Sequence, residues 1–567
     1  MRKTKVVLAK VLTAAMVISS FAGVQGITSE AAAKPKLSKK SVSITVGKTK
    51  KITVKNAKKY KVSWKMKSKK IASFKKSGKY AVKVKAKKAG KTTLTATIKK
   101  GKKTKKLVCK ITVKKNSPKV TKTPVNTPTT SPSNVPKTTE VPIVKPTATA
   151  TAEPQDTTPA MKEIFKGVID NVGTCLTYNQ TWNNRKEMQD ASTMEFVDKH
   201  FNSFTLENEM KPDNMLNKKT TISVADAKAK GYVISDDYKE STVPELTLET
   251  IDGVLAIAKQ HNIRMRAHTL MWHQQTPTWF FKKNYDDEEA VVDEATMNAR
   301  LEFFVRTVMR YTMQKEKELT GEVGSIVYAW DVLNEYIHRS NAAAATTWVS
   351  VYGDMGLKPT YVKAAFEYAY DELKKENVQD KVTLFYNDYD TYFSVDDELA
   401  LISYINEGEK AKICGGIGMQ SHVDIKRPTL EEYGNALKAF INAGLEVQIT
   451  ELDITINFDT DDTDGRTPSY GYKNEKETDV DQAAFTKDFI KQIVDIQKNR
   501  DKTISPKGIT GITVWGISDQ TSWRGGCKPL FFTRKSVRVK DETTGKYKTV
   551  YSYVPKKSYE AMIEALK

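Results

Sequence analysis

Two different patterns of apolar residues divide the chain. In residues 34–115, apolar side chains alternate with lysine and threonine at every second position, as at Val42, Ile44 and Val46. Period-two alternation is typical of β-strands with one buried face. About six runs of this kind at short spacing predict a small all-β sandwich. The other runs begin at Ile52, Val62, Val82, Leu94 and Leu107.

From about residue 161 the pattern changes to strand-like apolar runs that alternate with longer amphipathic segments. Ile251, Val254, Leu255 and Ala258 have helical spacing, and the strand-like run IRMRAHTLMWH follows them. Such alternation over about 400 residues predicts an α/β domain built on a parallel sheet, either closed or open. Further strand-like runs are IVYAWDVLNE, KVTLFYND, GGIGMQSH, EVQITELDI and GITVWGISD.

Polar residues at the ends of these runs favour a closed sheet. A (β/α)₈ TIM barrel gathers its functional groups at the C-terminal ends of its strands. An open doubly wound sheet usually carries a glycine-rich phosphate loop, but GGIG lacks the GxGxxG spacing and AGKTT lacks the first glycine of a P-loop. We therefore predict a barrel for residues 161–567. The polar groups that end the runs are His268, Trp272, His273, Asn334, Glu335, Asn387, Asp388, Gln420, His422, Glu451, Asp453, Trp515 and Asp519.

Composition defines two further segments. Residues 116–160 contain 12 Thr and 9 Pro, a composition that cannot build a core and predicts an extended linker. Residues 1–33 carry four basic side chains, an apolar stretch from Val11 to Val24 and a run of small residues, Ala31–Ala33. This order predicts a secretory signal peptide. A membrane anchor is the alternative, but the apolar stretch is shorter than the ~20 residues that a spanning helix needs.

The net charge of +25 is distributed unevenly. Residues 34–115 contain 32 Lys and no Asp or Glu, whereas residues 161–567 carry a net charge of −11. A concentrated positive charge favours an anionic partner. For an exported protein we expect an anionic cell-wall polymer or acidic groups on plant polysaccharide, and the alternative is a solvated spacer with no partner.

Nucleic acid is not expected as a partner, because no recognition helix is evident. After signal cleavage we expect no membrane insertion.

Four cysteines, Cys109, Cys175, Cys414 and Cys527, show no paired spacing. Export permits a disulfide, but free buried thiols fit the sequence equally well.

Two carboxylates stand out because each directly ends or interrupts an apolar strand. Glu335 and Glu451 lie 116 residues apart, which corresponds to three βα units of about 39 residues in a barrel with insertions. They would then lie on the fourth and seventh strands and face each other across the barrel mouth. Opposed carboxyl groups suit glycoside hydrolysis, in which one must be protonated and the other ionised.

Six motifs carry a family resemblance. In chain order across residues 161–567 they are FNSFTLENEMKP, RAHTLMWHQQTPTWF, WDVLNE, GIGMQSHVD, ITELDI and TVWGISDQTSWR, which is also their order in the family that they resemble. Together they resemble family 10 glycoside hydrolases, the endo-1,4-β-xylanases. The basic module, with ITVGKTKKITV and AKKAGKTTLTAT, resembles the bacterial immunoglobulin-like modules of surface and secreted proteins.

The resemblance implies a role for each matching residue. Glu335 is expected to be the general acid/base, and Glu451 the nucleophile of a retaining double displacement, with carboxyl groups ~5–5.5 Å apart. His422 and Asp453 are expected to keep Glu451 ionised, and Asp331 is expected to support the site indirectly. The implied substrate-binding residues are Glu207, Asn208, Lys211, His268, Trp272, Gln275, Asn334, Gln420, Trp515 and Trp523.

Some of these residues also have plainer interpretations. His268 and His273 could be core residues or metal ligands, but on a strand their spacing of five puts them on opposite faces, which argues against one shared zinc ion. Trp279 and Trp330 are expected to be packing residues. We predict no metal and no cofactor, because displacement by carboxylates needs neither.

Three functions are consistent with the sequence. The resemblance implies a secreted endo-1,4-β-xylanase acting on xylan or a related β-1,4-linked plant polysaccharide. A β-glucanase or mixed-specificity glycosidase could use the same barrel, since xylose and glucose differ only by a hydroxymethyl group. A non-catalytic cell-wall-binding protein is the third alternative, which the intact Glu335 and Glu451 disfavour.

An insertion of about twenty residues after Phe532 is expected to alter the aglycone side of the cleft.

Overall fold

The computed structural model describes residues 35–39, 41–57, 60–100, 103–114, 158–180, 185–457, 477–540, 545 and 547–567. These residues form two compact units, one within residues 1–148 and the other within residues 149–567. The predicted signal peptide (1–33) and nearly all of the predicted linker (116–160) lie outside the described residues. None of the helices in the described ranges is both long and apolar enough to cross a bilayer.

The smaller unit is all-β, as predicted. It contains two four-stranded sheets with strand orders β1-β3-β6-β5 and β2-β8-β7-β4. Apolar residues from both sheets, among them Ile52, Val82, Leu94 and Ile111, form one buried cluster, because the alternation turns them all inward. The strands are β1 (Lys36–Leu37), β2 (Ser41–Thr45), β3 (Thr49–Lys55), β4 (Lys61–Met66), β5 (Ala72–Gly78), β6 (Ala81–Ala86), β7 (Gly90–Lys100) and β8 (Lys103–Lys114).

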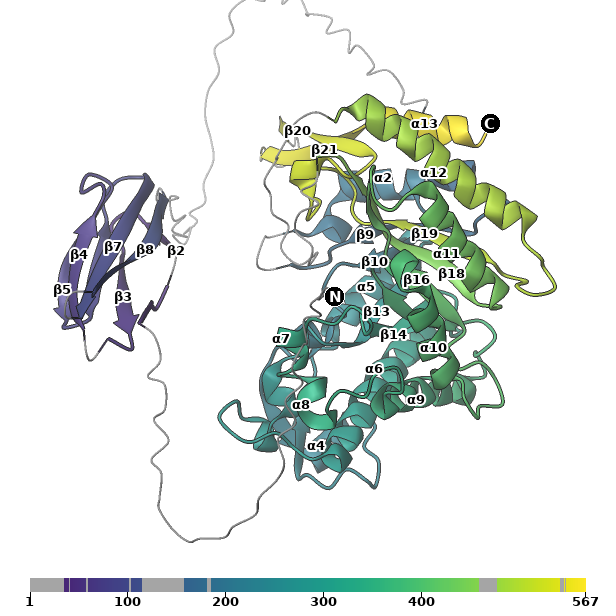
Figure 1. Ribbon diagram of the computed structural model, residues 1–567, viewed down its shortest axis with the longest axis horizontal. Coiled ribbons are helices and arrows are strands. Elements are labelled where there is room, and N and C mark those ends of the chain that lie inside the picture. The colour runs from purple at the N-terminus through teal and green to yellow at the C-terminus, as the bar shows by residue number, and fades with distance from the viewer. Residues whose placement is uncertain are drawn as a thin grey trace, which may run out of the picture. The chain divides into compact units, whose positions relative to one another are not determined.

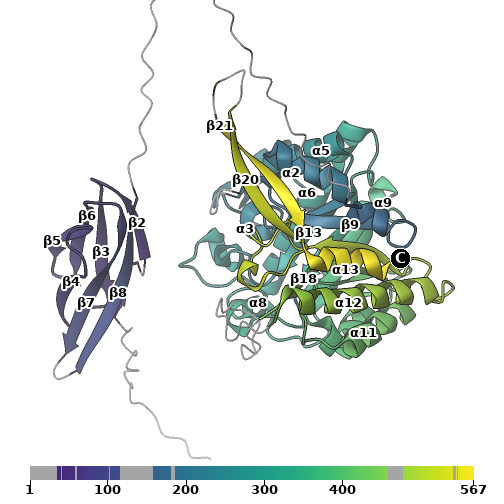
Figure 2. The same ribbon diagram turned by 90° about the horizontal axis from the view of Figure 1, so that it is seen from above.

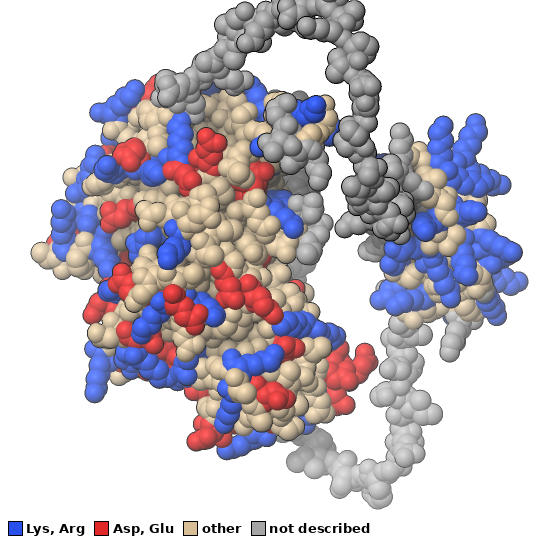
Figure 3. Space-filling view, turned by 180° about the vertical axis from the view of Figure 1, so that it is seen from behind, with Lys and Arg blue, Asp and Glu red and all other residues tan. Residues whose placement is uncertain are grey.

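Lysines cover the outside of this unit. Figure 3 shows Lys and Arg side chains spread over the visible face of the small unit, whereas the larger unit carries a mixture of both charges. The alternation explains this distribution, because β3 buries Ile52 and Val54 and exposes Lys51 and Lys55. The immunoglobulin-like type of the sandwich stays a prediction.

The larger unit contains the predicted (β/α)₈ barrel (Figure 1). Eight parallel strands form a closed ring, because the last strand pairs with the first and Gly511–Val514 lies beside Asn171–Thr174. In chain order the ring strands are β9 (Asn171–Leu176), β10 (Ser203–Leu206), β13 (Arg264–Trp272), β14 (Val327–Asn334), β15 (Thr383–Asp388), β16 (Gly416–Met419), β18 (Glu446–Thr455) and β19 (Ile509–Val514). Short strands β11 (Thr221–Ser223), β12 (Thr242–Pro244) and β17 (His422–Asp424) lie outside the ring.

Amphipathic helices surround the ring. In α5 the buried residues are Ile251, Val254, Leu255 and Ala258, which confirms the helical spacing predicted for them. Thr429 begins α11 with a capping box closed by Glu432. The longer helices are α2 (Ala191–His200), α5 (Glu249–His261), α6 (Glu294–Thr320), α9 (Thr360–Glu376), α10 (Val395–Ile405), α11 (Leu430–Asn442), α12 (Asp479–Asn499) and α13 (Lys557–Ala565); the shorter are α1 (Met161–Ile164), α3 (Pro212–Met215), α4 (Val224–Ala229), α7 (Asn341–Ala344) and α8 (Trp348–Tyr352).

The barrel interior contains a charged layer. Arg266 of β13 is fully buried, forms an ion pair with Asp331 of β14 and donates from Nε to Gln448 Oε1 of β18 at 3.1 Å. Gly418 of β16 leaves room for this layer: a Cβ atom there would lie 2.3 Å from Asn387 Oδ1 and 2.8 Å from Arg266 Nη2. A side chain at this position would therefore displace the buried polar network.

The strands become irregular near their C-terminal ends. Register shifts separate His268 from Met271 in the β13–β14 pair and Ile449 from Leu452 in the β18–β19 pair. Such irregularities re-aim side chains and are common next to functional sites. Glu451 lies within the second of these shifts.

The insertion after the last ring strand forms an antiparallel hairpin. Strands β20 (Phe532–Lys540) and β21 (Tyr547–Pro555) pair along their whole length and lead into α13. Figure 2 shows the hairpin as a two-stranded ribbon that projects from the barrel.

The buried ion pair of the barrel layer should be more important for stability than a surface pair. We expect Arg266→Met to lower the free energy of unfolding by about 3–5 kcal/mol, because it leaves Asp331 buried without its charge partner. Lys491→Met, which breaks the exposed Lys491–Asp495 pair, should cost less than about 1 kcal/mol. Urea unfolding of both variants measures the difference. Equal losses would contradict a special role for the buried pair.

Candidate active site

A cleft of about 450 Å³ opens at the C-terminal ends of the barrel strands. The structure brings together in it every predicted site residue except Asp453, which lies behind His422. The predicted residues that line the cleft are Glu207, Asn208, Lys211, His268, Trp272, Gln275, Asn334, Glu335, Gln420, His422, Glu451, Trp515 and Trp523. As predicted, Glu335 follows the fourth strand of the ring and Glu451 lies on the seventh.

Glu335 accepts hydrogen bonds from side chains at the ends of three strands: Trp272 of β13, Asn334 of β14 and Gln420 after β16. Its backbone has a φ of 56°, in the left-handed region that non-glycine residues rarely adopt outside special sites. Trp272 Nε1 donates to Glu335 Oε2 at 2.8 Å, and Gln420 Nε2 donates to Oε1 at 3.1 Å. Only 8% of Glu335 is exposed.

The environment of Glu335 favours its protonated form. Burial raises the pKa of its carboxyl group, and the negative charges of Asp388 and Glu451 act in the same direction. The hydrogen bond from Gln420 opposes them, and the resulting pKa is about 7. Glu335 can therefore hold a proton near neutral pH.

The environment of Glu451 has the opposite effect. Asn387 Nδ2 donates to Glu451 Oε1 at 3.0 Å, and His422 Nε2 lies 3.2 Å from Oε2. Burial alone would raise the pKa of this carboxyl group, but the hydrogen bond from His422 and the electrostatic attraction of His268 and Lys211 lower it to about 2. Glu451 is thus an anion across the usual pH range.

Asp453 explains why His422 can be a cationic donor. Burial would lower the pKa of the imidazole, but the charge of Asp453 raises it to about 9. His422 Nδ1 lies 2.8 Å from Asp453 Oδ2, and the same oxygen accepts a hydrogen bond from Trp523 Nε1 at 2.9 Å. An imidazolium at this position donates one N–H to each carboxylate.

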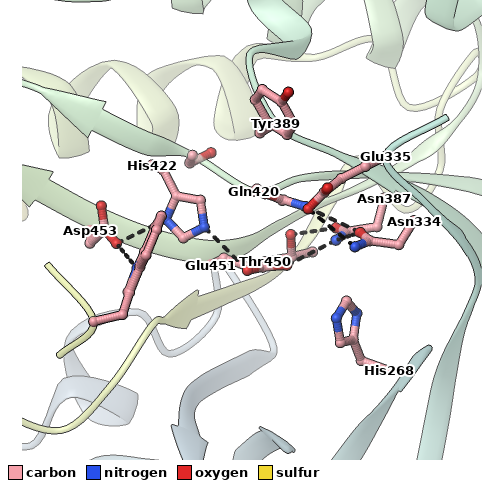
Figure 4. A network of polar contacts seen from close by, with 12 residues as sticks. His268, Asn334, Glu335, Asn387, Tyr389, Gln420, His422, Thr450, Glu451 and Asp453 are labelled. Carbon is pink, nitrogen blue, oxygen red and sulfur yellow. Dashed lines mark hydrogen bonds and ion pairs between the residues drawn. The ribbon is translucent and has the colours of Figure 1, made fainter. Parts of the chain in front are cut away.

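Two amides connect the carboxyl groups, as Figure 4 shows. Asn387 donates to Asn334 Oδ1 at 2.9 Å as well as to Glu451, and Asn334 Nδ2 lies 3.3 Å from Glu335 Oε1. Thr450 Oγ1 donates to Asn387 Oδ1 at 2.6 Å and fixes the orientation of that amide. Asn387 was noted in the sequence only as a strand-end residue, so its contact with Glu451 is new from the structure.

A polar wall lies next to the Glu451 side of the cleft. Glu207 Oε2 accepts from Arg185 Nη1 at 2.6 Å, and Asn208 Oδ1 accepts from Gln275 Nε2 at 3.2 Å. Lys211 Nζ lies 4.8 Å from the centroid of the Trp272 ring. Sequence reasoning missed Arg185, because it lies in a segment without a recognisable motif.

His268, within β13, and His273, directly after it, make different contacts. His268 Nδ1 lies 2.8 Å from Asp331 Oδ2 in the buried layer, so Asp331 supports the site through His268 and Arg266. His273 Nε2 accepts from the backbone N–H of Ser340 at 2.8 Å and does not share a ligand position with His268. Trp279 and Trp330 are buried packing residues.

One trio of possible metal ligands lies near Glu335. The ligand atoms of His338, Asp388 and Glu398 lie within 4.8 Å of one another. His338 Nδ1 already contacts Asp388 Oδ1 at 3.1 Å, and Ser394 donates to Glu398 at 3.1 Å. Because the trio is held by these protein contacts, we assign it no metal; its part in the site is the charge of Asp388, which raises the pKa of Glu335. The prediction that the chain needs no metal stays untested.

All four cysteines have free thiols. Burial raises the pKa of the Cys175 and Cys414 thiols, so both are expected to be unreactive.

The geometry therefore places a proton donor and a permanent anion in one cleft, with aromatic walls formed by Trp272, Trp515 and Trp523. Flat apolar rings and hydrogen-bonding amides suit a sugar, which has an apolar face and a polar rim. This arrangement can protonate a leaving oxygen and attack the carbon that carries it.

Comparison with known proteins agrees with this chemistry. The family model "Glycosyl hydrolase family 10" matches residues 160–551. The chain is 40% identical to endo-1,4-β-xylanase A of Butyrivibrio fibrisolvens over 62% of this chain and 76% of that protein. It is 32% identical to endo-1,4-β-xylanase B of the same organism over 59% of this chain, but that match spans only 46% of the relative.

A solved structure of the Clostridium thermocellum endo-1,4-β-D-xylanase 10B modules with xylohexaose matches with a TM-score of 0.49. Its identity is 27%, over 71% of this chain and 67% of that one. The family model covers more than half of the chain, and the first relative is matched over most of its length. The chain therefore belongs to glycosyl hydrolase family 10.

Proposed function

We propose that this chain is a secreted endo-1,4-β-xylanase that hydrolyses internal β-1,4 linkages of xylan with retention of anomeric configuration. The observation that carries the proposal is the pair Glu335 and Glu451, which line one cleft with pKa values of about 7 and about 2. The names of the two Butyrivibrio relatives support xylan as the substrate.

The reaction follows from these two charge states. Glu451 attacks the anomeric carbon while the proton of Glu335 passes to the leaving glycosidic oxygen, which gives a glycosyl ester on Glu451. Glu335, now ionised, takes a proton from water, and the hydroxide oxygen attacks the same carbon and releases Glu451. Glu335 ends the cycle protonated again.

The remaining residues position the sugar. Asn334 is oriented by Asn387 and is proposed to bind the 2-hydroxyl group at the cleavage point. Trp515 and Trp523 are proposed to cover the apolar faces of that ring. Glu207, Asn208 and Lys211 are proposed to hold the next sugar along the chain.

A β-glucanase activity remains the alternative on the same barrel. The described cleft contains no feature that favours glucan over xylan, whereas the relatives named above are xylanases. Reducing-sugar release from xylan and from soluble cellulose separates the two activities, and also separates both from a non-catalytic protein.

The basic unit is proposed to hold the enzyme near an anionic cell-wall polymer. Its 32 lysines and lack of acidic residues support the idea, together with the exposure of lysines along β3 and β4. Secretion rests on the N-terminal sequence pattern.

Removal of the proposed nucleophile should abolish activity. We expect Glu451→Ala to reduce xylan hydrolysis by more than about 10⁴-fold, because alanine cannot form the covalent bond to the anomeric carbon on which the proposed reaction depends. The control is Glu446→Gln, on the same strand but beside Lys507 and Thr510 at the other end of the barrel. It should keep nearly full activity. Comparable activity of Glu451→Ala and wild type would refute the assignment.

The pH profile should report the two pKa values. Glu335 acts in its protonated form, so kcat/KM should fall as the pH rises through about 7. Glu451 acts as an anion, so activity should be lost only as the pH falls towards about 2. Asp453→Asn weakens the His422 donor and should move the acid limb to higher pH, while the alkaline limb stays in place. Movement of both limbs together would contradict the separate assignments.

Binding through the basic unit should depend strongly on salt. We expect the full chain to bind purified teichoic acid at low ionic strength and to lose most of this binding by about 0.5 M salt. Replacing four exposed lysines on strands β3 and β4 with uncharged glutamine should weaken binding, whereas the same replacement of four lysines in helices α6 and α9 should not. The test set is Lys50, Lys51, Lys61 and Lys65→Gln, and the control set is Lys315, Lys317, Lys374 and Lys375→Gln. Equal effects of the two sets in a pull-down would contradict a specific role for the unit.

A further inference from the structure

A second, larger groove of about 1310 Å³ continues from the active-site cleft. Glu207 and Trp523 line both spaces, so the two are contiguous. The outer wall of the groove includes Arg534 of β20 and Tyr551 of β21, which belong to the hairpin inserted before α13. Nothing in the reaction described above uses this hairpin.

The hairpin presents one face of aromatic and arginine side chains. The pairing register places Arg534 opposite Tyr553 and Ser536 opposite Tyr551, so these four residues share one face of the ribbon. The Arg534 guanidinium lies 4.5 Å from the centroid of the Tyr551 ring. Within the described part of the chain, no carboxylate forms an ion pair with Arg534, so its N–H donors are available to a ligand.

The base of the hairpin is firmly attached to the barrel. The Tyr553 ring packs at a tilt against Phe196 of α2 with ring centroids 4.3 Å apart, and its hydroxyl lies 2.9 Å from Thr193 Oγ1. The backbone N–H of Tyr551 donates to Ser192 Oγ at 3.0 Å, and that of Arg534 donates to Gln520 Oε1 at 2.7 Å. Tyr551 and Arg534 are therefore held in place before any ligand arrives.

The charges of the groove favour a neutral ligand. Its lining contains five basic and five acidic residues. Seven of the ten are already in ion pairs: Arg185 with Glu207 and Glu187, Lys556 with Asp519 at 2.9 Å, and Lys528 with Asp479 at 3.6 Å. A polar, charge-balanced groove with one half-buried tyrosine ring suits an uncharged sugar chain better than a polyanion.

The groove lies on the nucleophile's side of the cleft. Trp523, which lines the groove, donates a hydrogen bond to Asp453, and Asp453 orients the His422 donor to Glu451. The positive charge of Lys211, beside Glu207, lowers the pKa of Glu451. The sugar attacked by Glu451 and the units before it would thus extend towards the hairpin. The sequence led us to expect an effect on the aglycone side; with the sugar positions proposed above, the lining that the hairpin shares with Glu207 favours the glycone side.

We propose that the Arg534–Tyr551 face of the hairpin is an additional binding site for β-1,4-linked xylose units, beyond those held by Glu207 and Trp523 on the glycone side. A xylose ring stacks on Tyr551, and Arg534 donates to its hydroxyl groups. The site makes the enzyme select long chains over short ones. This inference rests on the proposed xylanase function.

The test compares a long and a short substrate in the full-length enzyme. Xylohexaose can reach the hairpin, whereas an aryl β-xylobioside fills only the two positions next to the cleavage point. We expect Tyr551→Ala and Arg534→Ala each to lower kcat/KM for xylohexaose about ten-fold, equivalent to ~1.4 kcal/mol of lost binding, and to leave the aryl xylobioside unchanged. Tyr551→Phe should keep wild-type values, because it keeps the ring.

Matched controls lie on the opposite face of the ribbon. Lys535→Ala removes a basic side chain next to Arg534, and Val550→Ala removes a side chain next to Tyr551; both should behave as wild type. Equal losses on both substrates, or no loss on either, would overturn the inference while wild-type activity upholds the proposed function. A wild-type enzyme that cleaves neither substrate would instead refute the proposed function and the inference together.

Discussion

The site depends on keeping one buried carboxylate ionised. Glu451 is only 5% exposed, and an unpaired charge at such a position would be expelled or neutralised. His422 prevents this by donating to it while Asp453 stabilises the imidazolium, and Asn387 donates to the other oxygen. The negative charge that results is one reason why Glu335 keeps its proton. The charge of Glu451 therefore helps to set the protonated state of Glu335.

The barrel supplies the framework for this arrangement. Its strands deliver Asn334, Asn387, Gln420 and Glu451 to one mouth from four different segments of the chain, as parallel strands in a closed ring must. Beneath them, the buried pair of Arg266 and Asp331 connects the strands and fixes His268. The active site is thus the upper part of a continuous polar layer inside the barrel.

Much of this could be predicted from the sequence, because the relevant signals are local. Glu335 and Glu451 follow or interrupt apolar strands, and the number of strand-like runs between them places them on the fourth and seventh strands. Contacts made by residues without a local signal could not be predicted. Arg185, which forms an antiparallel bridge with Gln180, reaches Glu207 without any local sequence signal, and the left-handed backbone at Glu335 has none either. The strands of the hairpin could have been predicted, because Val537 and Val539 alternate with basic residues. Such alternation does not indicate where on the barrel the hairpin lies.

The projecting ribbon carries a further consequence for solubility. Among the described residues, β20 and β21 pair only with each other, so no third strand covers the outer edge of either. Exposed edges of this kind can recruit strands from other molecules and start aggregation, particularly beside apolar side chains such as the 60% exposed Val537. Lys535, Arg538, Lys540 and Lys548 place like charges along these edges and oppose such pairing. Efforts to trim surface charge from this protein for crystallisation or storage should therefore leave the lysines of the ribbon intact.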